Sequence, residues 1–556
     1  MPFKVLALLC KHWSVANFRR DHSIEAMAHT TYDLVVVGAG MTGAGVALDA
    51  ASRGLRVALI DGGDVASGTS SKSSKMVHGG LRYLQQREFR LVYENLRERR
   101  RLLENAPFLV RPLPFLVPLF GRNGVASKAL VKGYSTALRI YDLSGGWRIG
   151  QRHRKITPDE ALALLPTLNT DRLVAGFLYY DARGDDARVA LALAKTAALD
   201  FGADVATYVR CVEILHDLTG RVNAVVAHDL LADATFTLTT RAVVNATGVW
   251  ADDVFTMAEH TPSHRITPAK GVHLSVPRHR LPADVAAVLN VPGDRRSIFV
   301  VPFEGAAFTY VGTTDSAYDG DLDEPHCTSE DVAYLLAAVN ASTSSNLTTS
   351  DVTGLWAGLR PLLAPVDGKE VKARTADLSR RHQVTDSRNG VVHITGGKWT
   401  TYRLMAEDTV DALGPYVTDL KGGRTKRLRL HGVGSWRPTS EREIHLYERF
   451  GEDATVVLDL IAVNEELGEC PIEGQPYLGA EFVFSVRFEM ATSLIDLLTR
   501  RSRAHLLDAR ATLRGAARVG ALVAPVLGWS DEELQRQLNE YESLVRREFS
   551  AAGLTL

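Results

Sequence analysis

The stretch from residue 33 to residue 61 constrains the fold of this chain more than any other. A short β-branched run, typical of a buried parallel strand, meets the pattern G-x-G-x-x-G at Gly38, Gly40 and Gly43. A helical stretch follows, and a second apolar run then ends in Asp61. Because strand, glycines, helix, second strand and acid agree, the segment predicts a βαβ unit that binds a dinucleotide.

Each part of this unit has a physical role. Gly38 permits a tight turn, Gly40 lets the backbone approach a pyrophosphate, and Gly43 lets the helix pack closely on the strand. Free N–H groups at the helix N-terminus attract phosphates, and the Asp61 carboxylate can bind ribose hydroxyls. A glycine-rich turn without a ligand is the alternative, and the motif alone does not choose between NAD and FAD.

A polar segment, GTSSKSSKMVHGGLRY from Gly68 to Tyr83, follows this unit closely. It combines hydroxyls, two lysines, a histidine, a Gly-Gly pair and an arginine, with His78 and Arg82 four residues apart. Hydroxyls and amides in such a loop can hold phosphates while its charged groups lie beside a cofactor. A loop that is rich in serine only because it is flexible is the alternative.

Composition excludes several classes of protein. The 556 residues predict two or three domains, and a net charge of −1 gives no bulk attraction to nucleic acid, so we expect no nucleic-acid partner. The 4 cysteines have neither metal-ligand spacing nor a disulfide framework, which predicts no metal and fits a reducing compartment. No apolar run approaches the roughly 18 to 20 residues of a spanning helix. Residues 1–31 lack a clear cleavage site and are interpreted as an N-terminal extension.

The remaining patterns predict segments that return to one nucleotide domain, followed by a helical tail. Expected helices are 89–105, 124–143 and 186–202, and expected strands are 205–214, 222–228, 241–248, 298–314 and 391–395. From about residue 427 the pattern becomes helical, with capping boxes at Ser440 and Ser530. Segment 124–143 carries cations among apolar residues, so it either lies on a bilayer surface or packs on a neighbouring domain.

Seven motifs in this order resemble the flavin-dependent, respiratory glycerol-3-phosphate dehydrogenases. They are VVVGAGMTGAGVALDAASRG, SSKSSKMVHGGLRYL, NATGVW, KGVHL, VGTTD, GLRPL and TGGKWTTYR, and they span about Asp33 to Arg403. The histidine-containing HGGLRYL and the lysine-containing GGKWTTYR are the specific ones. The N-terminal extension departs from the family pattern, and Asp61 stands where glutamate is commoner.

The resemblance implies an α/β fold of the amino-acid-oxidase-like flavoprotein type. A Rossmann-like FAD-binding domain, interleaved with an antiparallel-sheet substrate domain, precedes a C-terminal all-α domain. The expected bounds are 32–110, 180–262 and 352–420 for the FAD-binding domain, 111–179 and 263–351 for the substrate domain, and 427–556 for the helical domain. Non-covalent FAD is expected to take a hydride from C2 of sn-glycerol 3-phosphate and so give dihydroxyacetone phosphate.

The substrate phosphate needs a cationic clamp, and the candidates are Arg82, Arg360 and Lys398, each in a glycine-containing, partly apolar context. A structural salt bridge is the alternative for each of them. In the family, residues matching Arg82, Tyr83, Arg360 and Lys398 line the phosphate site. A threonine of GTTD, here Thr313 or Thr314, contributes there.

The C2 hydroxyl also needs a proton acceptor. Two histidines lie in motifs, His273 and His78, and either can accept this proton directly or through water. His273 ranks first because KGVHL is typical of a strand of the substrate layer, whereas His78 is expected beside the flavin. A histidine that only donates or accepts a structural hydrogen bond is the alternative for both.

The predicted FAD-binding residues are glycines, hydroxyls and amides of these motifs. They are Gly38, Gly40, Gly43, Asp61, Thr69, Ser70, Ser74, Lys75, Gly79, Ala246, Gly248, Gly397 and Thr400. Hydroxyls and backbone amides suit pyrophosphate and ribityl oxygens, and the Gly-Gly before Lys398 brings N–H groups near the flavin pyrimidine.

Three other functions remain open from sequence. One is an oxidase that passes electrons to O₂ and releases H₂O₂, another is a neighbouring flavoprotein such as an amine oxidase, and the third is a flavin-binding protein without turnover. The resemblance implies a membrane quinone as electron acceptor and a cytoplasmic protein bound peripherally to the inner face of the cytoplasmic membrane. A homodimer is a further expectation, with the helical domain as its contact.

Overall fold

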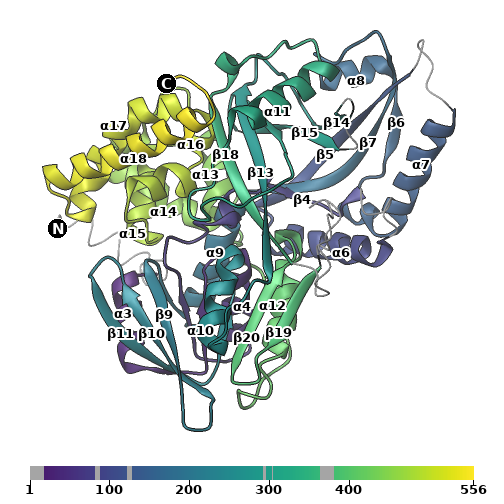
Figure 1. Ribbon diagram of the computed structural model, residues 1–556. Helices are drawn as coiled ribbons and strands as arrows, with labels where there is room; N and C mark the ends of the chain where they lie inside the picture. Colours follow the sequence, from purple (N-terminus) through teal and green to yellow (C-terminus); the bar gives the residue numbers. More distant parts are fainter. Residues whose placement is uncertain are drawn as a thin grey trace.

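The computed structural model describes residues 18–81, 88–121, 128–291, 293, 296–303, 305–363 and 381–556. Two sheet-based layers are joined by a group of C-terminal helices (Figure 1). The predicted substrate residues Arg82 and Tyr83 lie outside the described residues.

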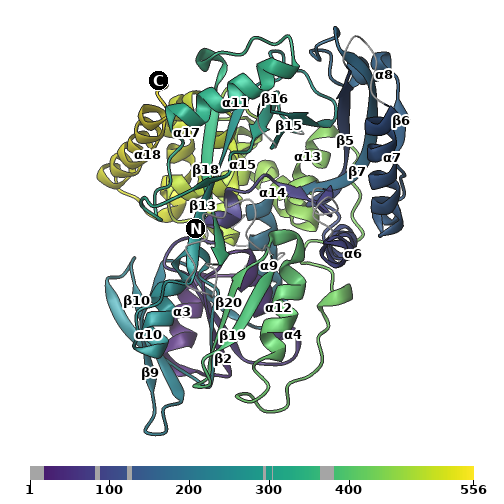
Figure 2. The same ribbon diagram turned by 45° about the vertical axis from the view of Figure 1, so that its right-hand side comes forward.

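The first layer is a six-stranded sheet in the order β19-β20-β12-β2-β3-β8. Its strands are β2 (Leu34–Val37), β3 (Val57–Ile60), β8 (Asp204–Ala206), β12 (Val243–Asn245), β19 (His382–Asp386) and β20 (Val391–Gly396). All neighbours are parallel except β19 and β20. Helices α4 (Met41–Ser52), α9 (Asp186–Leu199) and α12 (Tyr402–Asp411) accompany this sheet (Figure 2). Segments far apart in sequence therefore form one parallel, Rossmann-like layer, as predicted.

A smaller four-stranded sheet lies beside this layer. Its strands are β1 (Thr31–Tyr32), β9 (Val209–His216), β10 (Val222–Asp229) and β11 (Ala234–Thr240), with α10 (Ala251–Glu259) nearby. Helix α3 (Arg20–His29) contacts both β8 and β11. Its Met27 is buried, and the amide of Val205 donates to Ser23 Oγ over 3.2 Å. The interpretation of all of 1–31 as an extension outside the fold is therefore wrong, because apolar contact and hydrogen bonding hold α3 on the sheet.

The second layer is a ten-stranded, mainly antiparallel sheet. Its strands are β4 (Met76–Val77), β5 (Val110–Phe120), β6 (Arg154–Ile156), β7 (Leu173–Gly184), β13 (Ile266–Pro277), β14 (Ala286–Asn290), β15 (Ser297–Phe303), β16 (Phe308–Gly312), β17 (Ser316–Ala317) and β18 (Gly354–Leu363). Helices α6 (Phe89–Asn105), α7 (Lys128–Leu143), α8 (Pro158–Leu164) and α11 (Ser329–Ser342) accompany it. Strand β4, the end of β7 and all of β18 were assigned from sequence to the nucleotide domain, and the pairing corrects this. Strand β18, for example, pairs with β13 over ten residues.

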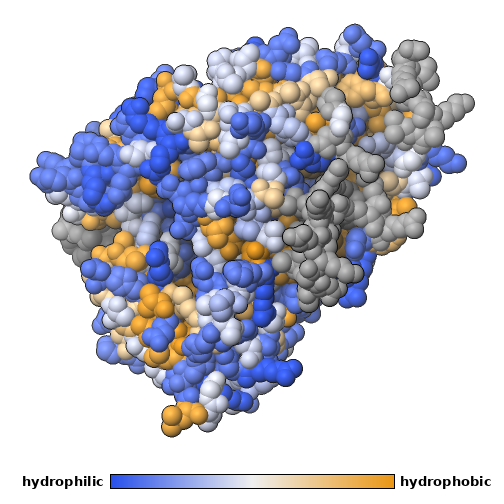
Figure 3. Space-filling view, viewed as in Figure 1, coloured by the Kyte–Doolittle hydropathy of each residue, from blue (hydrophilic) through white to orange (hydrophobic). Residues whose placement is uncertain are grey.

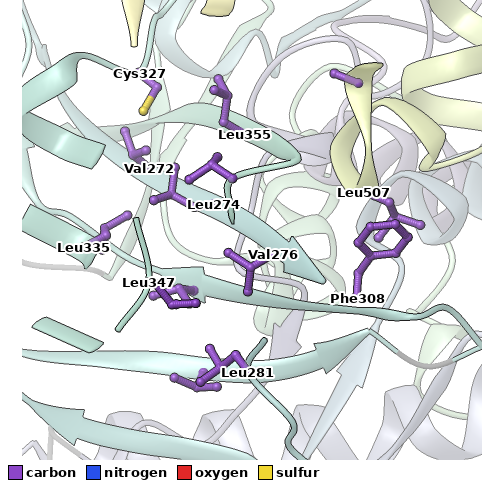
Figure 4. Close-up of a cluster of buried hydrophobic side chains, with 14 of the residues drawn as sticks. Val272, Leu274, Val276, Leu281, Phe308, Cys327, Leu335, Leu347, Leu355 and Leu507 are labelled. Atoms are coloured by element: carbon purple, nitrogen blue, oxygen red, sulfur yellow. The ribbon is translucent and has the colours of Figure 1, made fainter. Parts of the chain in front are cut away.

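Strand β13 separates the core of this layer from the functional site. Val272, Leu274 and Val276 point into a hydrophobic cluster that also contains Leu335 of α11 and Leu507 of the C-terminal helices (Figure 4). Because successive side chains of a strand point to opposite faces, the alternate residues of β13 lie on the other face of the sheet.

The C-terminal helices are α13 (Glu441–Phe450), α14 (Ala454–Val463), α15 (Gly479–Phe488), α16 (Ala504–Leu507), α17 (Ala509–Leu527) and α18 (Asp531–Ala551), with a π-helical turn at Asp496–Arg501. The predicted capping box is confirmed at Ser440, whose hydroxyl accepts from the amide of Glu443 over 3.2 Å while the Glu443 carboxylate accepts from the amide of Ser440 over 3.3 Å. At Ser530 only the N-cap half is present, since its hydroxyl accepts from the amide of Glu533 over 3.2 Å. Helices α17 and α18 lie on the side of the molecule opposite α7 (Figure 1).

Buried ion pairs join these helices to the nucleotide layer. Arg501 donates to both carboxylate oxygens of Asp64 over 2.7 and 2.8 Å. Arg503 bonds Asp185 and Asp186, the residues that begin α9. The imidazole of His431 hydrogen-bonds the carboxylate of Asp200 in the nucleotide layer over 3.4 Å and that of Asp453 in the helical part over 3.2 Å. A buried charge is costly without its partner, so these pairs fix the helical part on the nucleotide layer.

Candidate active site

The glycine turn after β2 is shaped by its neighbours. Gly38 has φ of +105°, and a Cβ there would lie 2.7 Å from the carbonyl oxygen of Ala246. A Cβ on Gly43 would overlap the carbonyl of Gly38, so the helix approaches the strand as closely as predicted. A Cβ on Gly40 would meet only Ser70, with its hydroxyl at 3.0 Å. Gly40 therefore faces the serine-rich segment across the N-terminus of α4.

Asp61 directly follows β3, beside this turn. Its carboxylate accepts from the amides of Ala39 and Gly63 over 2.6 and 2.8 Å. Burial raises the pKa of Asp61, while the two amide bonds oppose that rise. The carboxylate is thereby fixed where the fingerprint predicts a ribose ligand, and the glycine cradle with a fixed acid fits the nucleotide half of FAD.

The serine-rich segment crosses from the nucleotide turn to the large sheet. Ser70 Oγ accepts from the amide of Met41 over 2.8 Å, and Thr69 Oγ1 donates to the carbonyl of Leu359 over 2.6 Å. Ser74 Oγ lies 2.7 Å from Nε2 of His273. The segment thus connects the start of α4 with strands β18 and β13.

Two predicted cofactor residues of this segment have other partners. Lys75 Nζ donates to Asp186 over 3.1 Å and to the carbonyl of Ser71 over 3.0 Å. Burial, and then the nearby Arg503, lower its pKa to about 8. The Gly79 amide donates to Asp181 over 3.1 Å. Both groups therefore hold the loop in place, and their contact with a cofactor stays a prediction.

The side chain of Arg360 in β18 lies over the neighbouring strand β13, because β13 has a glycine, Gly271, at the point of contact. A Cβ on Gly271 of β13 would overlap the guanidinium of Arg360 and lie 2.8 Å from Thr313 Oγ1. Arg360 donates to Thr313 Oγ1 over 3.4 Å and to the Thr314 carbonyl over 3.3 Å, and its other nitrogen lies 3.3 Å from Asp315. Thr314 is buried, and its hydroxyl accepts from the amide of Val272 over 3.1 Å. The structure thus brings Arg360 and both predicted threonines together.

His273 lies on the same face of β13 as Gly271. Its ring stacks on Trp356 with centroids 4.8 Å apart and planes 9° from parallel. Burial lowers the pKa of His273 well below its usual value, and the Lys75 and Arg360 cations lower it further. The ring is therefore neutral at physiological pH, and it can accept a proton.

The TGGKWTTYR motif, which carries Lys398, begins at the end of β20, and β20 contacts β18. Gly396 and Gly397 have φ of +72° and +78°, a backbone conformation that glycine adopts without strain. Lys398 follows with its ammonium nitrogen buried, and Thr400 is buried in the next short turn. Gly248, with φ of +65°, opens the turn after β12. His78 lies directly after β4 and is half-buried.

Sequence reasoning missed three residues of this site. Trp356 stacks on His273, Tyr310 donates to the carbonyl of Ser74 over 2.9 Å, and Asp315 pairs with Arg360. Trp356 stands four residues before Arg360 in β18 and so shares its face, but no strand was predicted from sequence at this position. Asp315 could have been found, since it is the last residue of the VGTTD motif, whereas Tyr310 gave no signal beyond standing directly before that motif.

The described residues contain neither a membrane-spanning helix nor a metal-binding group. Within these ranges every helix is too short or too polar to cross a bilayer. Clusters of three or more His, Cys, Asp or Glu suited to a metal ion are likewise absent from them.

Comparison with known proteins gives matches over nearly the whole chain. Residues 33–411 match the model of the FAD dependent oxidoreductase family, and residues 416–534 match the C-terminal domain of alpha-glycerophosphate oxidase. Glycerol-3-phosphate dehydrogenase 2 of Mycobacterium tuberculosis is 38% identical, over 93% of this chain and 88% of that protein. The human mitochondrial glycerol-3-phosphate dehydrogenase is 35% identical, over 93% and 74%. The crystal structure of the glycerol-3-phosphate dehydrogenase from Bacillus halodurans complexed with FAD superposes with a TM-score of 0.78 at 30% identity, covering 97% and 99%.

Proposed function

The chain belongs to the FAD-dependent glycerol-3-phosphate dehydrogenases, and from this premise we propose how its own residues oxidise sn-glycerol 3-phosphate to dihydroxyacetone phosphate. One observation carries the proposal: Arg360 and its threonines lie on the same sheet face as the neutral, buried His273. A phosphate clamp beside a proton acceptor is the arrangement that this substrate requires.

Arg360 binds the phosphate, because a planar guanidinium offers paired donors to its oxygens. Thr313 or Thr314, Lys398, and the predicted Arg82 and Tyr83 complete the clamp. FAD, when bound, accepts the hydride from C2. The glycine cradle and Asp61 hold its nucleotide half, with Thr69, Ser70, Ala246, Gly248, Gly397 and Thr400 as further contacts.

His273 takes the proton of the C2 hydroxyl, and His78 remains the alternative acceptor. The hydrogen bond of Nε2 to Ser74 and the stacking on Trp356 fix the ring. Arg360 is one of the cations that lower the pKa of His273. A phosphate dianion on Arg360 offsets that effect, so substrate binding strengthens the base in the same step.

Anaerobic mixing of the FAD-loaded protein with glycerol 3-phosphate tests the proposal. Flavin absorbance near its visible maximum should bleach within seconds, and Arg360→Met should abolish bleaching at equal FAD content. Unchanged flavin absorbance in the FAD-loaded protein would contradict the proposal that glycerol 3-phosphate is the substrate. Rapid reoxidation by a quinone supports the quinone acceptor, whereas rapid reoxidation by air with H₂O₂ release supports an oxidase.

We propose peripheral membrane contact through α7, on the inner face of the cytoplasmic membrane. Its Leu138 and Tyr141 are buried, while Leu143 is 82% exposed and Lys132 and Arg139 of the same helix are exposed as well. The face of the molecule in Figure 3 mixes hydrophilic and hydrophobic residues. Apolar side chains beside cations suit an anionic bilayer surface.

Sedimentation with anionic liposomes tests this contact. Lys132→Gln with Arg139→Gln should weaken binding several-fold, whereas the same exchange at Arg546 of α18 should not. Equal binding of all three proteins contradicts the α7 contact. A homodimer through the C-terminal helices is proposed as well, and analytical ultracentrifugation distinguishes it from a monomer.

A further inference from the structure

Arg503 links the C-terminal helices to the serine-rich segment of the candidate active site. It stands between the π-helical turn 496–501 and α16, and its side chain is buried. The guanidinium donates to Asp185 and Asp186 at the start of α9 and, over 3.3 Å, to the carbonyl of Ser71. Helix α16 itself contacts β13 and β18 (Figure 1). Arg503 therefore joins the helical part, the nucleotide layer and the serine-rich segment.

Asp186, which Arg503 binds, also holds Ser73 of the serine-rich segment. One oxygen of its buried carboxylate accepts from the amide and the hydroxyl of Ser73, over 3.0 and 2.6 Å. The other oxygen accepts from Lys75 over 3.1 Å and from Arg503. The Ser73 carbonyl accepts from the indole nitrogen of Trp356 over 3.3 Å. The amide, hydroxyl and carbonyl of Ser73 are therefore all bonded, and these bonds fix its position.

The neighbours of Ser73 are the groups that fix the proposed base. Trp356 stacks on His273, and the hydroxyl of Ser74 lies 2.7 Å from Nε2 of that histidine. Nδ1 of His273 is buried and has no hydrogen-bond partner among the described residues. The ring plane therefore depends on Trp356, and the hydrogen bond of the ring depends on Ser74. Because Ser73 bonds the first and directly precedes the second, a shift of Ser73 would disturb both.

We propose that Arg503 is a positioning residue for flavin reduction, because through Asp186 it holds Ser73 where Ser74 and Trp356 fix the His273 ring. This inference rests on the proposed role of His273 as the proton acceptor. A misplacement of about 1 Å can cost about a hundredfold in rate, so the chemistry is sensitive to such a support. The C-terminal helices thus contribute to the reaction through one arginine.

Stopped-flow reduction of the FAD-loaded protein by glycerol 3-phosphate measures this effect at matched FAD content. Arg503→Met should lower the rate at saturating substrate about fivefold or more. The substrate concentration for half-maximal rate should change less than about twofold, because Arg360 and its threonines keep their contacts. Arg503→Lys keeps the charge but has fewer donors, so it should recover part of the rate.

Arg188→Met is the matched control for this measurement. Arg188 is a buried arginine of α9 at the same interface. Its side chain donates to Glu489 over 2.6 and 2.8 Å and to the carbonyl of Arg449, and both of these residues belong to the helical part. The variant should therefore lose a comparable interface contact and still reduce its flavin within about twofold of the parent rate.

Ser73→Ala tests the same linkage from the other end. It leaves the ion pairs of Arg503 in place, so it is informative even if Arg503→Met folds poorly. It should slow reduction by about the same factor. In the double variant the loss should be smaller than the product of the two single losses, because both substitutions act on one linkage.

Hydrogen exchange of the FAD-loaded protein without substrate decides the loop contact separately. The amide of Ser73 donates to Asp186, and the amide of Lys75 donates to the Ser73 hydroxyl over 3.0 Å. Peptides covering residues 70–77 should exchange about tenfold faster in Arg503→Met than in Arg188→Met. A parent protein that failed to reduce its flavin would contradict the proposed oxidation, and the exchange result would still decide whether Arg503 holds the loop.

Three results would overturn the inference. Arg503→Met reduces its flavin as fast as Arg188→Met at matched FAD content, or the losses of Arg503→Met and Ser73→Ala multiply in the double variant, or residues 70–77 exchange equally fast in both arginine variants.

Discussion

Replacing Gly271 by alanine should disable the phosphate clamp without unfolding the protein. The added Cβ would overlap the guanidinium of Arg360 and lie 2.8 Å from Thr313 Oγ1, so the guanidinium must move by about 1 Å. Gly271 lies in β13 without a positive φ, so the backbone accepts alanine. The far end of an arginine side chain moves at little cost to folding.

The effect on catalysis follows from the lost phosphate contact. A hydrogen bond to a charged group contributes about 1.5–3 kcal/mol, so losing one should lower kcat/KM about 10- to 150-fold, mostly through KM. The assay is anaerobic flavin bleaching against glycerol 3-phosphate concentration, at matched FAD content. Gly422→Ala adds the same methyl group where no atom lies within 4 Å, and it is the control. A kcat/KM for Gly271→Ala within threefold of this control would refute the reasoning.

Three further predictions concern other parts of the molecule. Ser74→Ala removes the hydrogen bond to His273 and should slow flavin reduction about tenfold at saturating substrate, and stopped-flow rates within twofold of the parent contradict it. Arg503→Met removes the arginine from the partly exposed Asp185 and from the buried Asp186, which keeps only the cation of Lys75, and should cost about 3 kcal/mol, seen as earlier unfolding in urea than for Arg546→Met. Burial lowers the pKa of His431, but hydrogen bonds to two carboxylates raise it to about 9. Because this exceeds the unfolded value of about 6.5, the stabilisation is complete below about pH 6.5 and is lost as pH rises through about 9. His431→Gln should therefore lower Tm at about pH 6.5 and barely change it at about pH 10. An equal loss of Tm at both pH values would contradict the stabilisation of protonated His431 by its two carboxylates.

The nucleotide half of the fold could be predicted because its signals are local. Gly38 and Gly43 occupy positions where a side chain would collide with Ala246 or with the preceding turn, and such constraints act within a few residues or on one adjacent strand. The N-caps at Ser440 and Ser530 are local in the same sense. The resemblance to a flavoprotein family supplied what periodicity could not, namely which motifs belong to one site.

Domain membership was less accessible from sequence. Strand β18 follows the substrate layer in the chain, and the sequence assigned it to the nucleotide domain. Only its pairing with β13 places it in the large sheet, with Arg360 over Gly271. Helix α3 has no marked apolar face, so nothing in its sequence predicted its place against β8.

By itself, the sequence determined the dinucleotide turn and the family, and it supplied most of the candidate residues for the chemistry, because these depend on residue type and short spacing. Tertiary structure decided which of them meet. It placed Ser74 on His273 across about two hundred positions of chain, turned Lys75 toward Asp186, and set Arg183 opposite Arg111. Those outcomes depend on strand register and domain docking, which balance many weak contacts distributed over the whole chain and leave no local pattern to read.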